Sequence, residues 1–388
     1  MKVMTKKIDV LSWAVINPSK RGSFEDYICV LAKECGKRGI SIRFVFGDKI
    51  AQEPKKQFEL DGVDYDAVDV EKLFSVNTLA DILCKYSPDV IHFNFIGPGS
   101  LLIPVSHIYG IKKVIFSDHS SSPVLTQKPK NYIFTFPRLI KRKIFCMLVN
   151  RFIAVSNFVA DRLEVENNIP KNKITVLYNG IDLERFSGIQ QDERNRLRRS
   201  FLGQGAEKLI ITTVAQLISE KGIRVLLEGA RIALNTYHDL LFIIAGEGAD
   251  RDFLENNVKK WGAESNIKFI GFTENVKNLL AASDIFVLPS LWGEACSMAL
   301  IEAIAAGLPV ITTNVGGNPE IIQDGTTGLI VSPNNSKELA FALERLIIDN
   351  NLRASFGRAA YERAKKYFDI YKMVSETVSI YKKMLDNA

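Results

Sequence analysis

The chain has 388 residues, of which 47% are hydrophobic and 24% charged, and its formal net charge is +6. These values are typical of a folded globular protein and exclude disordered, collagen-like and membrane-spanning compositions. Because 388 residues exceed the size at which one hydrophobic core usually stops growing, we expect two domains.

The start of the chain predicts neither a signal peptide nor a membrane anchor. Lys6 and Lys7 precede an apolar run that Asp9 interrupts, so the run is too short for a signal sequence. No window offers the roughly 18 uncharged apolar residues that a transmembrane helix needs. The five cysteines include no Cys-x-x-Cys pair; they are Cys29, Cys35, Cys84, Cys146 and Cys296. Because such thiols form neither a disulfide framework nor a zinc site, we expect a cytoplasmic protein.

Short β-branched and aromatic runs alternate with helical segments along the chain, which is the pattern of βαβ units and a parallel sheet. In the first half the predicted strands are IDVLSWAVI, ISIRFVFG, DVIHFNF, KKVIFSDH, RFIAVS and ITVLYNG. In the second half they are KLIITTVAQL, LLFIIAG, IKFIGF, IFVLPS, PVITTN and GLIVS. We therefore predict an α/β protein with two doubly wound, Rossmann-like domains.

The domain boundary is predicted at the start of a charged, glycine-punctuated segment, residues 187–208. This boundary gives an N-terminal domain at 1–186 and a C-terminal domain at 187–369. The end of the chain is nearly all helix-forming, and its last piece carries apolar residues at helical spacing. Such an apolar face must pack against another element.

The positive charge has a local origin. From 119 to 160 there is no acidic residue, while seven basic residues occur: Lys128, Lys130, Arg138, Lys141, Arg142, Lys143 and Arg151. Within 128–151 these cations are interleaved with aromatic residues, a pattern that suits a helix lying on an anionic membrane surface. In the alternative, Ile140, Ile144, Met147 and Leu148 pack on the sheet and the cations are solvated. The sequence leaves both interpretations open.

The segment 289–333 carries the strongest candidate site. The predicted strand IFVLPS ends in a loop that holds Glu294, and a helix begins near Ser297 and carries Glu302 about one turn later. Ligands of open α/β sheets bind at the carboxyl ends of strands, where a helix N-terminus offers unpaired N–H groups to a phosphate. Because a carboxylate can accept hydrogen bonds from two adjacent hydroxyls, the two glutamates can flank a ligand that bears sugar or ribose hydroxyls.

This segment resembles the C-terminal signature of the retaining glycosyltransferases of family 4, a glutamate pair eight residues apart followed by small residues and a Gly-x-Pro-Val-Ile strand. Here Glu294 and Glu302 precede AIAAGLPVIT, VGGNPEII and GTTGLIVSP. The resemblance implies that Glu302 binds the donor ribose and Glu294 the transferred sugar. It also implies that backbone N–H groups of Ala295, Cys296 and Ser297 lie near sugar and phosphate. The sequence reads EACS where the family usually has EGFG, so we expect Ala295 and Cys296 to reshape the donor-sugar pocket.

The resemblance extends over almost the whole chain. VAQLISEKGIRVLLEGA is similar to the family's phosphate-binding strand, loop and helix, which implies that Lys221 contacts the diphosphate. Gln216 stands at the family's arginine position and so removes one fixed positive charge. IKFIGFTENVKNLLAASDIFVLPS resembles the segment beside the nucleotide base, which implies that the turn at Phe272 and Thr273 contacts the base.

In the first half, NPSKRGSFEDYICVLAKECGKRGISIRF resembles the family's opening motif Gly-Gly-x-Glu. Gly22 and Ser23 fall on the glycine pair and Glu25 on the glutamate. Gly22 is then expected to let the backbone approach the diphosphate, although a loop glycine is also an ordinary turn former and Glu25 can simply begin a helix. His119, at the end of KKVIFSDH, matches the family histidine beside the transferred sugar, so we predict His119 and Glu294 to be catalytic. We expect His92, in the body of a strand, to be structural.

The family resemblance implies the GT-B fold, in which two Rossmann-like domains face each other across a cleft. It also implies that the last helix, 370–388, packs back on the N-terminal domain. The activity it implies is transfer of a sugar from a nucleotide-sugar donor to a hydroxyl acceptor, with retention of the anomeric configuration. Lys221 and the helix after Glu294 would stabilise the charge of the leaving diphosphate. Because no Asp-x-Asp stands in a strand-end loop, we expect neither a metal nor another cofactor.

The sequence leaves the donor and the acceptor open. A UDP-sugar is favoured as donor over a GDP-sugar, and the acceptor is expected to be a glycan or lipid-linked glycan; nucleic acid is not an expected partner. The basic stretch 128–151 is the reason to consider peripheral attachment to the inner face of the membrane. The alternatives are a nucleotide-sugar epimerase of the same fold, a silent binding module, and an NAD(P)-dependent oxidoreductase suggested by AGEGADRDFLE, in which Arg251 replaces the third glycine.

Overall fold

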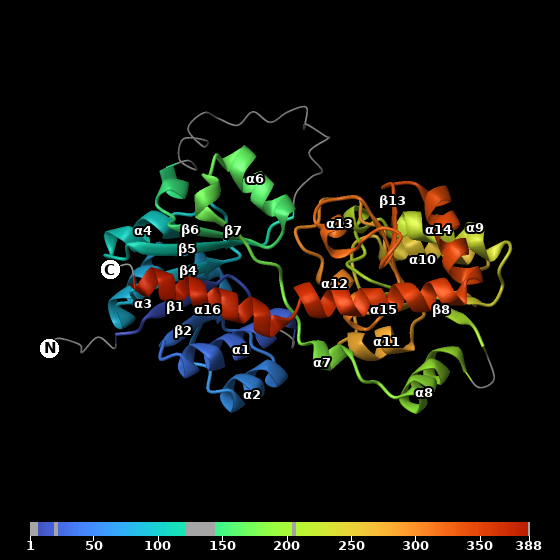
Figure 1. Cartoon of the computed structure of the whole chain (residues 1–388), viewed down its shortest axis with the longest axis horizontal. Helices are drawn as coiled ribbons and strands as arrows, with labels where there is room; N and C mark the ends of the chain where they lie inside the picture. Colours follow the sequence, from blue (N-terminus) through green and yellow to red (C-terminus); the bar gives the residue numbers. More distant parts are fainter. Residues whose placement is uncertain (1–6, 19–21, 122–143, 204–206, 387–388) are drawn as a thin grey trace. The chain divides into compact units, whose positions relative to one another are not determined.

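The computed structural model describes residues 7–18, 22–121, 144–203 and 207–386. The chain divides into two compact units, which are considered separately (Figure 1). The first unit comprises Met1–Ser120, Gln127–Gly180 and Ile370–Ala388, and the second comprises Ser121–Thr126 and Ile181–Asp369. Among the described helices, none has the length and apolar character needed to cross a membrane.

The first unit contains a parallel sheet of seven strands in the order β3-β2-β1-β4-β5-β6-β7. The strands are β1 (Val10–Ala14), β2 (Ile42–Gly47), β3 (Tyr65–Val68), β4 (Val90–Asn94), β5 (Lys113–Asp118), β6 (Arg151–Ala154) and β7 (Ile174–Val176). The helices are α1 (Ser23–Lys37), α2 (Gln52–Leu60), α3 (Val76–Tyr86), α4 (Leu102–Ile108), α6 (Asn157–Asn167) and α16 (Ile370–Asp386). Strands β1 and β4 are buried along their whole length, as expected for a sheet that helices cover on both faces.

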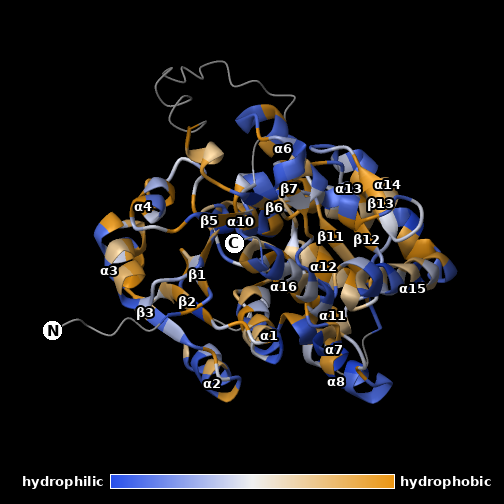
Figure 2. Cartoon of the chain, turned by 60° about the vertical axis from the view of Figure 1, so that its left-hand side comes forward, coloured by the Kyte–Doolittle hydropathy of each residue, from blue (hydrophilic) through white to orange (hydrophobic). Residues whose placement is uncertain are grey.

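The second unit contains a parallel sheet of six strands in the order β10-β9-β8-β11-β12-β13. The strands are β8 (Leu209–Val214), β9 (Leu240–Ala245), β10 (Ile267–Gly271), β11 (Ile285–Leu288), β12 (Val310–Thr313) and β13 (Gly328–Val331). The helices are α7 (Leu183–Phe186), α8 (Gln191–Leu202), α9 (Ile223–Leu234), α10 (Arg251–Lys260), α11 (Val276–Ala282), α12 (Met298–Ala305), α13 (Asn318–Ile321), α14 (Ser336–Ile348) and α15 (Asn350–Tyr367). In Figure 2, β11 and β12 have hydrophobic colours. Both units are therefore doubly wound, and the predicted fold class is confirmed.

The last helix, α16, belongs to the first unit. Its buried side chains Ile370, Val374, Val378 and Tyr381 recur at helical spacing and join the core that also contains residues of α1 and β4. Figure 1 shows α16, in red, beside α1. The apolar face that the sequence left without a partner is thus buried on the N-terminal sheet, as the fold class implied.

Two details differ from the sequence analysis. Strand β3 was not predicted, because its residues lie at the sheet edge, are partly exposed and include Asp66, so the segment lacks an apolar pattern. The division between the units falls at Ile181 and not at 187, since α7 packs against α11 and α12 of the second unit.

Candidate active site

A lysine and a glutamate meet at the carboxyl edge of the second sheet. Strands β8 and β11 are neighbours; the loop after β8 carries Lys221, and the loop after β11 carries Glu294. Lys221 Nζ lies 2.6 Å from Glu294 Oε1, and the same oxygen accepts a hydrogen bond from Ser290 Oγ at 2.7 Å. Only 9% of the Glu294 side chain and 25% of the Lys221 side chain are exposed. The pair is therefore a partly buried charge pair at the edge where α/β sheets bind ligands.

The pair lies in a small open hollow of about 210 Å³. This hollow brings together five residues predicted from the sequence: Gln216, Lys221, Glu294, Cys296 and Ser297. Gln216 is exposed and Cys296 half-buried. The hollow combines a cation, a carboxylate and neutral polar groups, which is a chemical environment suited to a phosphate bonded to a sugar.

Two glycines allow the loops around the pair to approach each other. Gly222 has φ of +67°, and a Cβ there would lie 2.0 Å from the carbonyl oxygen of Pro289. Gly316 has φ of +56°, and a Cβ there would lie 2.3 Å from the carbonyl oxygen of Glu294. Gly222 lies within VAQLISEKGIRVLLEGA and Gly316 within VGGNPEII, but no role was predicted for either glycine. Both are needed because only glycine combines a positive φ with such close backbone contact.

Helix α12 begins directly after this loop. Ser297 is its N-cap residue with extended backbone, and Ala295 and Ser297 are buried. Glu302 lies within α12 and is half-buried. Among the predicted donor-binding residues of the loop after β11 and of α12, Ala295 and Glu302 do not line the 210 Å³ hollow. The prediction that a helix begins near Ser297 is confirmed by this geometry.

Phe272 and Thr273 follow the edge strand β10, so they occupy the same carboxyl edge two strands away from β8. Phe272 is 56% exposed, and Thr273 Oγ1 accepts a hydrogen bond from the Asn275 N–H at 3.1 Å. These two residues are not among those lining the hollow around Lys221 in the described structure. An aromatic ring of this kind can stack on a planar base.

In the first unit, His119 comes directly after β5, and the neighbouring strand β4 ends at Asn94. The half-buried imidazole has Nε2 3.2 Å from Asn94 Oδ1, and the Phe95 ring stacks on it with 4.3 Å between centroids. Burial lowers the pKa of His119 to about 4, against the smaller opposing effect of the Asp118 carboxylate. His119 is therefore neutral at pH 7.

His92 has a different environment in the same unit. It is 1% exposed; Nδ1 lies 2.7 Å from the Tyr381 hydroxyl of α16, and Nε2 lies 2.7 Å from Ser117 Oγ. Burial lowers the pKa of His92 to about 3, with a further lowering from His119. Both ring nitrogens are used inside the core, which agrees with a structural role.

Gly22 and Glu25 form the cap of α1. The Gly22 N–H donates a hydrogen bond to Glu25 Oε2 at 3.0 Å, and Ser23 is the first residue of the helix. Gly22 has φ of −127°, an extended conformation open to any residue. The interpretation in which Glu25 begins a helix therefore accounts for its position.

The glycines that suggested a dinucleotide site have a structural explanation. A Cβ on Gly246 would lie 1.8 Å from the Ala215 carbonyl oxygen, and one on Gly248 would lie 2.3 Å from that of Leu217. The loops after β8 and β9 therefore pack backbone against backbone. This close packing accounts for Gly-x-Gly without a bound dinucleotide.

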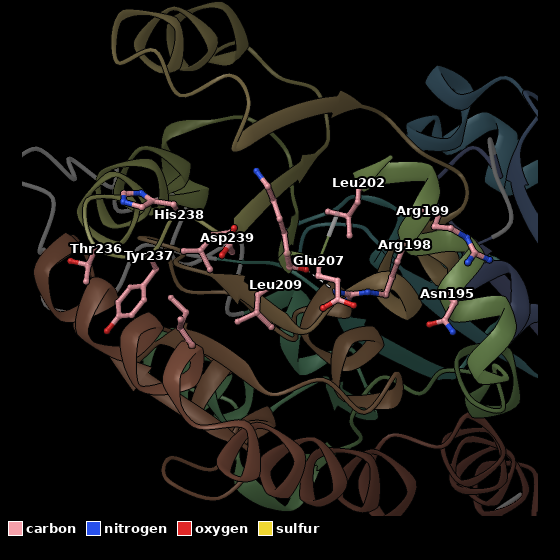
Figure 3. A pocket seen from close by; sticks show the side chains of 13 residues that line it. Asn195, Arg198, Arg199, Leu202, Glu207, Leu209, Thr236, Tyr237, His238 and Asp239 are labelled. Carbon is pink, nitrogen blue, oxygen red and sulfur yellow. Dashed lines mark hydrogen bonds between the residues drawn. The ribbon is translucent and has the colours of Figure 1, made fainter. Parts of the chain in front are cut away.

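A larger hollow of about 940 Å³ lies at the opposite edge of the second sheet (Figure 3). Its lining includes Leu209 and Leu240, at the amino ends of β8 and β9, and charged residues of both signs such as Arg199 and Asp239. None of the predicted site residues within the described structure lines it. Because ligands of open α/β sheets bind at the carboxyl edge, we place the candidate active site around Lys221 and Glu294.

Two doubly wound units, each built on a parallel sheet, are the architecture of the GT-B fold. The family model for glycosyl transferases group 1 matches residues 195–363, and that for glycosyltransferase family 4 matches residues 25–185. The chain thus belongs to the GT-B glycosyltransferases.

Three known proteins illustrate the similarity. An uncharacterized glycosyltransferase of Methanocaldococcus jannaschii is 32% identical over 59% of this chain and 59% of its own length. The UDP-Gal:α-D-GlcNAc-diphosphoundecaprenol α-1,3-galactosyltransferase of Escherichia coli is 25% identical over 82% of this chain and 81% of its own. The crystal structure of Anabaena HepE in complex with UDP has a TM-score of 0.78 at 19% identity, covering 97% of this chain and 100% of the other. At that identity the structural match supports the fold alone.

Proposed function

We propose that this protein transfers a sugar from a nucleotide-sugar donor to a hydroxyl acceptor with retention of the anomeric configuration. The observation that carries the proposal is the Lys221–Glu294 pair at the adjoining carboxyl ends of β8 and β11. Without a ligand, Glu294 neutralises the lysine. When a diphosphate binds, the ammonium group can turn to the phosphate oxygens, and Glu294 becomes available to accept hydrogen bonds from sugar hydroxyls.

The chemistry requires positive charge where negative charge develops. The acceptor hydroxyl forms a bond to the anomeric carbon on the side from which the diphosphate leaves, the bond from that carbon to the phosphate oxygen breaks, and the departing phosphate oxygen takes the acceptor proton. Lys221 stabilises the leaving diphosphate, and Glu302 binds the donor ribose. His119 contacts the transferred sugar. No enzyme base is needed in this scheme.

The donor is proposed to be a UDP-sugar and the acceptor a glycan or lipid-linked glycan. The name of the Escherichia coli relative specifies UDP-galactose and a diphosphoundecaprenol acceptor, and HepE was solved with UDP. Both relatives named above are glycosyltransferases, which favours transfer over the epimerase alternative. Phe272 and Thr273 are the residues we propose beside the base.

Nucleotide release from a panel of UDP- and GDP-sugars, with glycan and polyprenyl-diphosphate acceptors, tests this function. We expect release from a UDP-sugar that depends on the acceptor, and a product whose anomeric configuration by NMR equals that of the donor. Failure to release nucleotide from any donor would contradict the proposed activity. An inverted product would contradict retention alone.

We also propose that transfer requires no metal, because Lys221 supplies charge at the diphosphate. Turnover measured after treatment with EDTA should equal that of untreated enzyme. If EDTA abolishes turnover and Mg²⁺ or Mn²⁺ restores it, a metal is required.

We further propose that 128–151 rests on the anionic inner face of the membrane. Residues 128–143 lie outside the described part of the structure. In the described part, Ile144 and Met147 are 52% and 70% exposed, while Cys146 and Val149 are buried. In the alternative interpretation, the apolar side chains of this segment pack on the sheet and its cations are solvated. For Ile144 and Met147 that interpretation is wrong, because both side chains are exposed. Their exposure supports a surface that can insert apolar groups between lipids.

Cosedimentation with vesicles that contain anionic lipid tests the membrane proposal. Wild type should sediment with these vesicles and remain in solution with neutral ones, and Lys141→Gln, Arg142→Gln, Lys143→Gln together should weaken binding. Equal binding by the triple variant, or no binding by wild type, would contradict it without affecting the proposed activity.

A further inference from the structure

The backbone is unusual where β4 ends. Four described residues other than glycine have positive φ: Ser87, Phe95, Asn168 and Asn334. Ser87 and Asn168 are C-caps of helices, and asparagine tolerates this conformation better than most residues. Phe95, with φ of +59°, is the one aromatic residue among these four and directly follows the buried strand β4. A bulky side chain in a left-handed conformation is strained, and such strain clusters at functional sites.

The left-handed turn brings the Phe95 ring onto His119. The two rings stack with 4.3 Å between centroids and 21° between planes. Phe24, at the start of α1, packs edge-on against the Phe95 ring at 4.9 Å and against His119 at 6.4 Å. Aromatic contacts of this kind fix the plane of the imidazole. The ring plane of His119 is thus determined by neighbours on two other elements.

Asn94 determines which ring nitrogen of His119 carries the proton. Its side chain is 2% exposed, and its Oδ1 lies 3.2 Å from His119 Nε2. Because an amide oxygen only accepts, this orientation requires a proton on Nε2 and leaves the lone pair on Nδ1. The Asn94 Nδ2 is buried and has no hydrogen-bond partner among the described residues. A buried amide that leaves a donor unsatisfied is costly for stability, so packing alone does not account for an asparagine at this position.

We propose that Asn94 and Phe95 are positioning residues that hold His119 with its Nδ1 lone pair ready to accept a hydrogen bond from a hydroxyl of the transferred sugar. Asn94 selects the tautomer, and Phe95 selects the ring plane. The inference rests on the proposed function for its substrate. The geometry of the ring, however, can be measured without turnover.

Two variants of Phe95 separate positioning from folding. Phe95→Tyr keeps an aromatic ring for stacking and should keep kcat near that of wild type. Phe95→Gly removes the ring and relieves the backbone strain, so kcat should fall about tenfold while the affinity for UDP is unchanged. Asn168→Gly, a second left-handed position in the same unit, is the matched control and should leave kcat unaltered.

The role of Asn94 is tested by measuring the tautomer of His119 in wild type and in Asn94→Ala. The tautomer is determined from the ring ¹⁵N chemical shifts of histidine-labelled protein, and the His119→Gln variant assigns the signal. Wild type should show the Nε2-protonated form, and Asn94→Ala should show a mixture. Unchanged shifts in Asn94→Ala, or equal kcat for Phe95→Gly and wild type, would overturn the inference and leave the transferase proposal standing. A wild type that shows the tautomer but transfers no sugar would instead overturn the proposed function.

Discussion

The carboxyl edges of the two sheets carry different chemistry. In the second unit, Lys221 and Glu294 form a charge pair in a small polar hollow. In the first unit, His119 is kept neutral, stacked on an aromatic ring and bound to a buried amide. Charge suits a leaving diphosphate, whereas an uncharged, oriented ring suits the hydroxyls of a sugar. The difference predicts that substitutions at the two edges affect different steps.

The largest effect is expected for Lys221→Ala. Removing a fixed positive charge at the leaving group should lower kcat/KM by about 10²–10³, or roughly 3–4 kcal/mol, and should also weaken UDP binding. Lys208→Ala, which alters the hollow at the opposite edge, is the control and should behave as wild type. If Lys208→Ala is the more damaging change, the nucleotide site has been assigned to the wrong edge.

Glu302→Ala tests the ribose contact on α12. Loss of the carboxylate leaves hydroxyls of the donor without a partner, so the transition state should lose about 2–4 kcal/mol of stabilisation. The value of kcat/KM should fall accordingly. The measurement is steady-state kinetics with the best donor from the screen, together with a melting curve to verify the fold. Wild-type kcat/KM in a folded variant would contradict the role of Glu302.

His119→Ala should separate transfer from nucleotide binding. We expect kcat to fall by about thirtyfold, or roughly 2 kcal/mol, because one oriented contact to the sugar is lost. UDP affinity, measured by calorimetry, should stay close to that of wild type. An equal loss of UDP affinity would place His119 in the nucleotide site or make it a determinant of the fold.

The smallest effect concerns His92 and stability in acid. Its folded pKa of about 3 lies below the ordinary value of 6.5, so the unfolded chain binds a proton that the native protein excludes. The stability due to neutral His92 is complete above pH 6.5 and is lost as the pH falls toward 3. Between pH 7 and 5.5 this loss is about 1 kcal/mol.

Urea unfolding of wild type and His92→Gln over that pH range measures this loss. The variant should have a flatter dependence on pH, and His238→Gln, an exposed histidine of the second unit, should have the slope of wild type. A slope for His92→Gln as steep as that of wild type would show that His92 does not cause the acid sensitivity.

The two edges also differ in how far the sequence predicts them. Buried strands such as β9 and β11 have continuous apolar runs and were predicted, whereas β3 was missed because an edge strand with exposed positions has no such run. Glu294 was predicted from a local motif. Its pairing with Lys221, 73 residues away, depends on strand order, which periodicity does not determine.

The environment of His119 was less predictable. His119 was predicted from its place after a strand together with the family resemblance. Phe95 carries no turn signal such as glycine or asparagine, and its left-handed backbone follows from tertiary contacts. Gly316, by contrast, was visible as part of a Gly-Gly pair in VGGNPEII. Its role required knowledge of the backbone of Glu294 that it touches.

Hydrogen exchange of backbone amides with and without saturating UDP tests the position of the nucleotide site most directly. We expect slower exchange in 215–222 and 294–302, around Lys221 and Glu294, with little change at 94–95. Residues 207–209 and 236–240, at the amino edge of the second sheet, should exchange at the same rate in both samples. Protection confined to that amino edge, or no protection anywhere, would contradict the assignment of the nucleotide site.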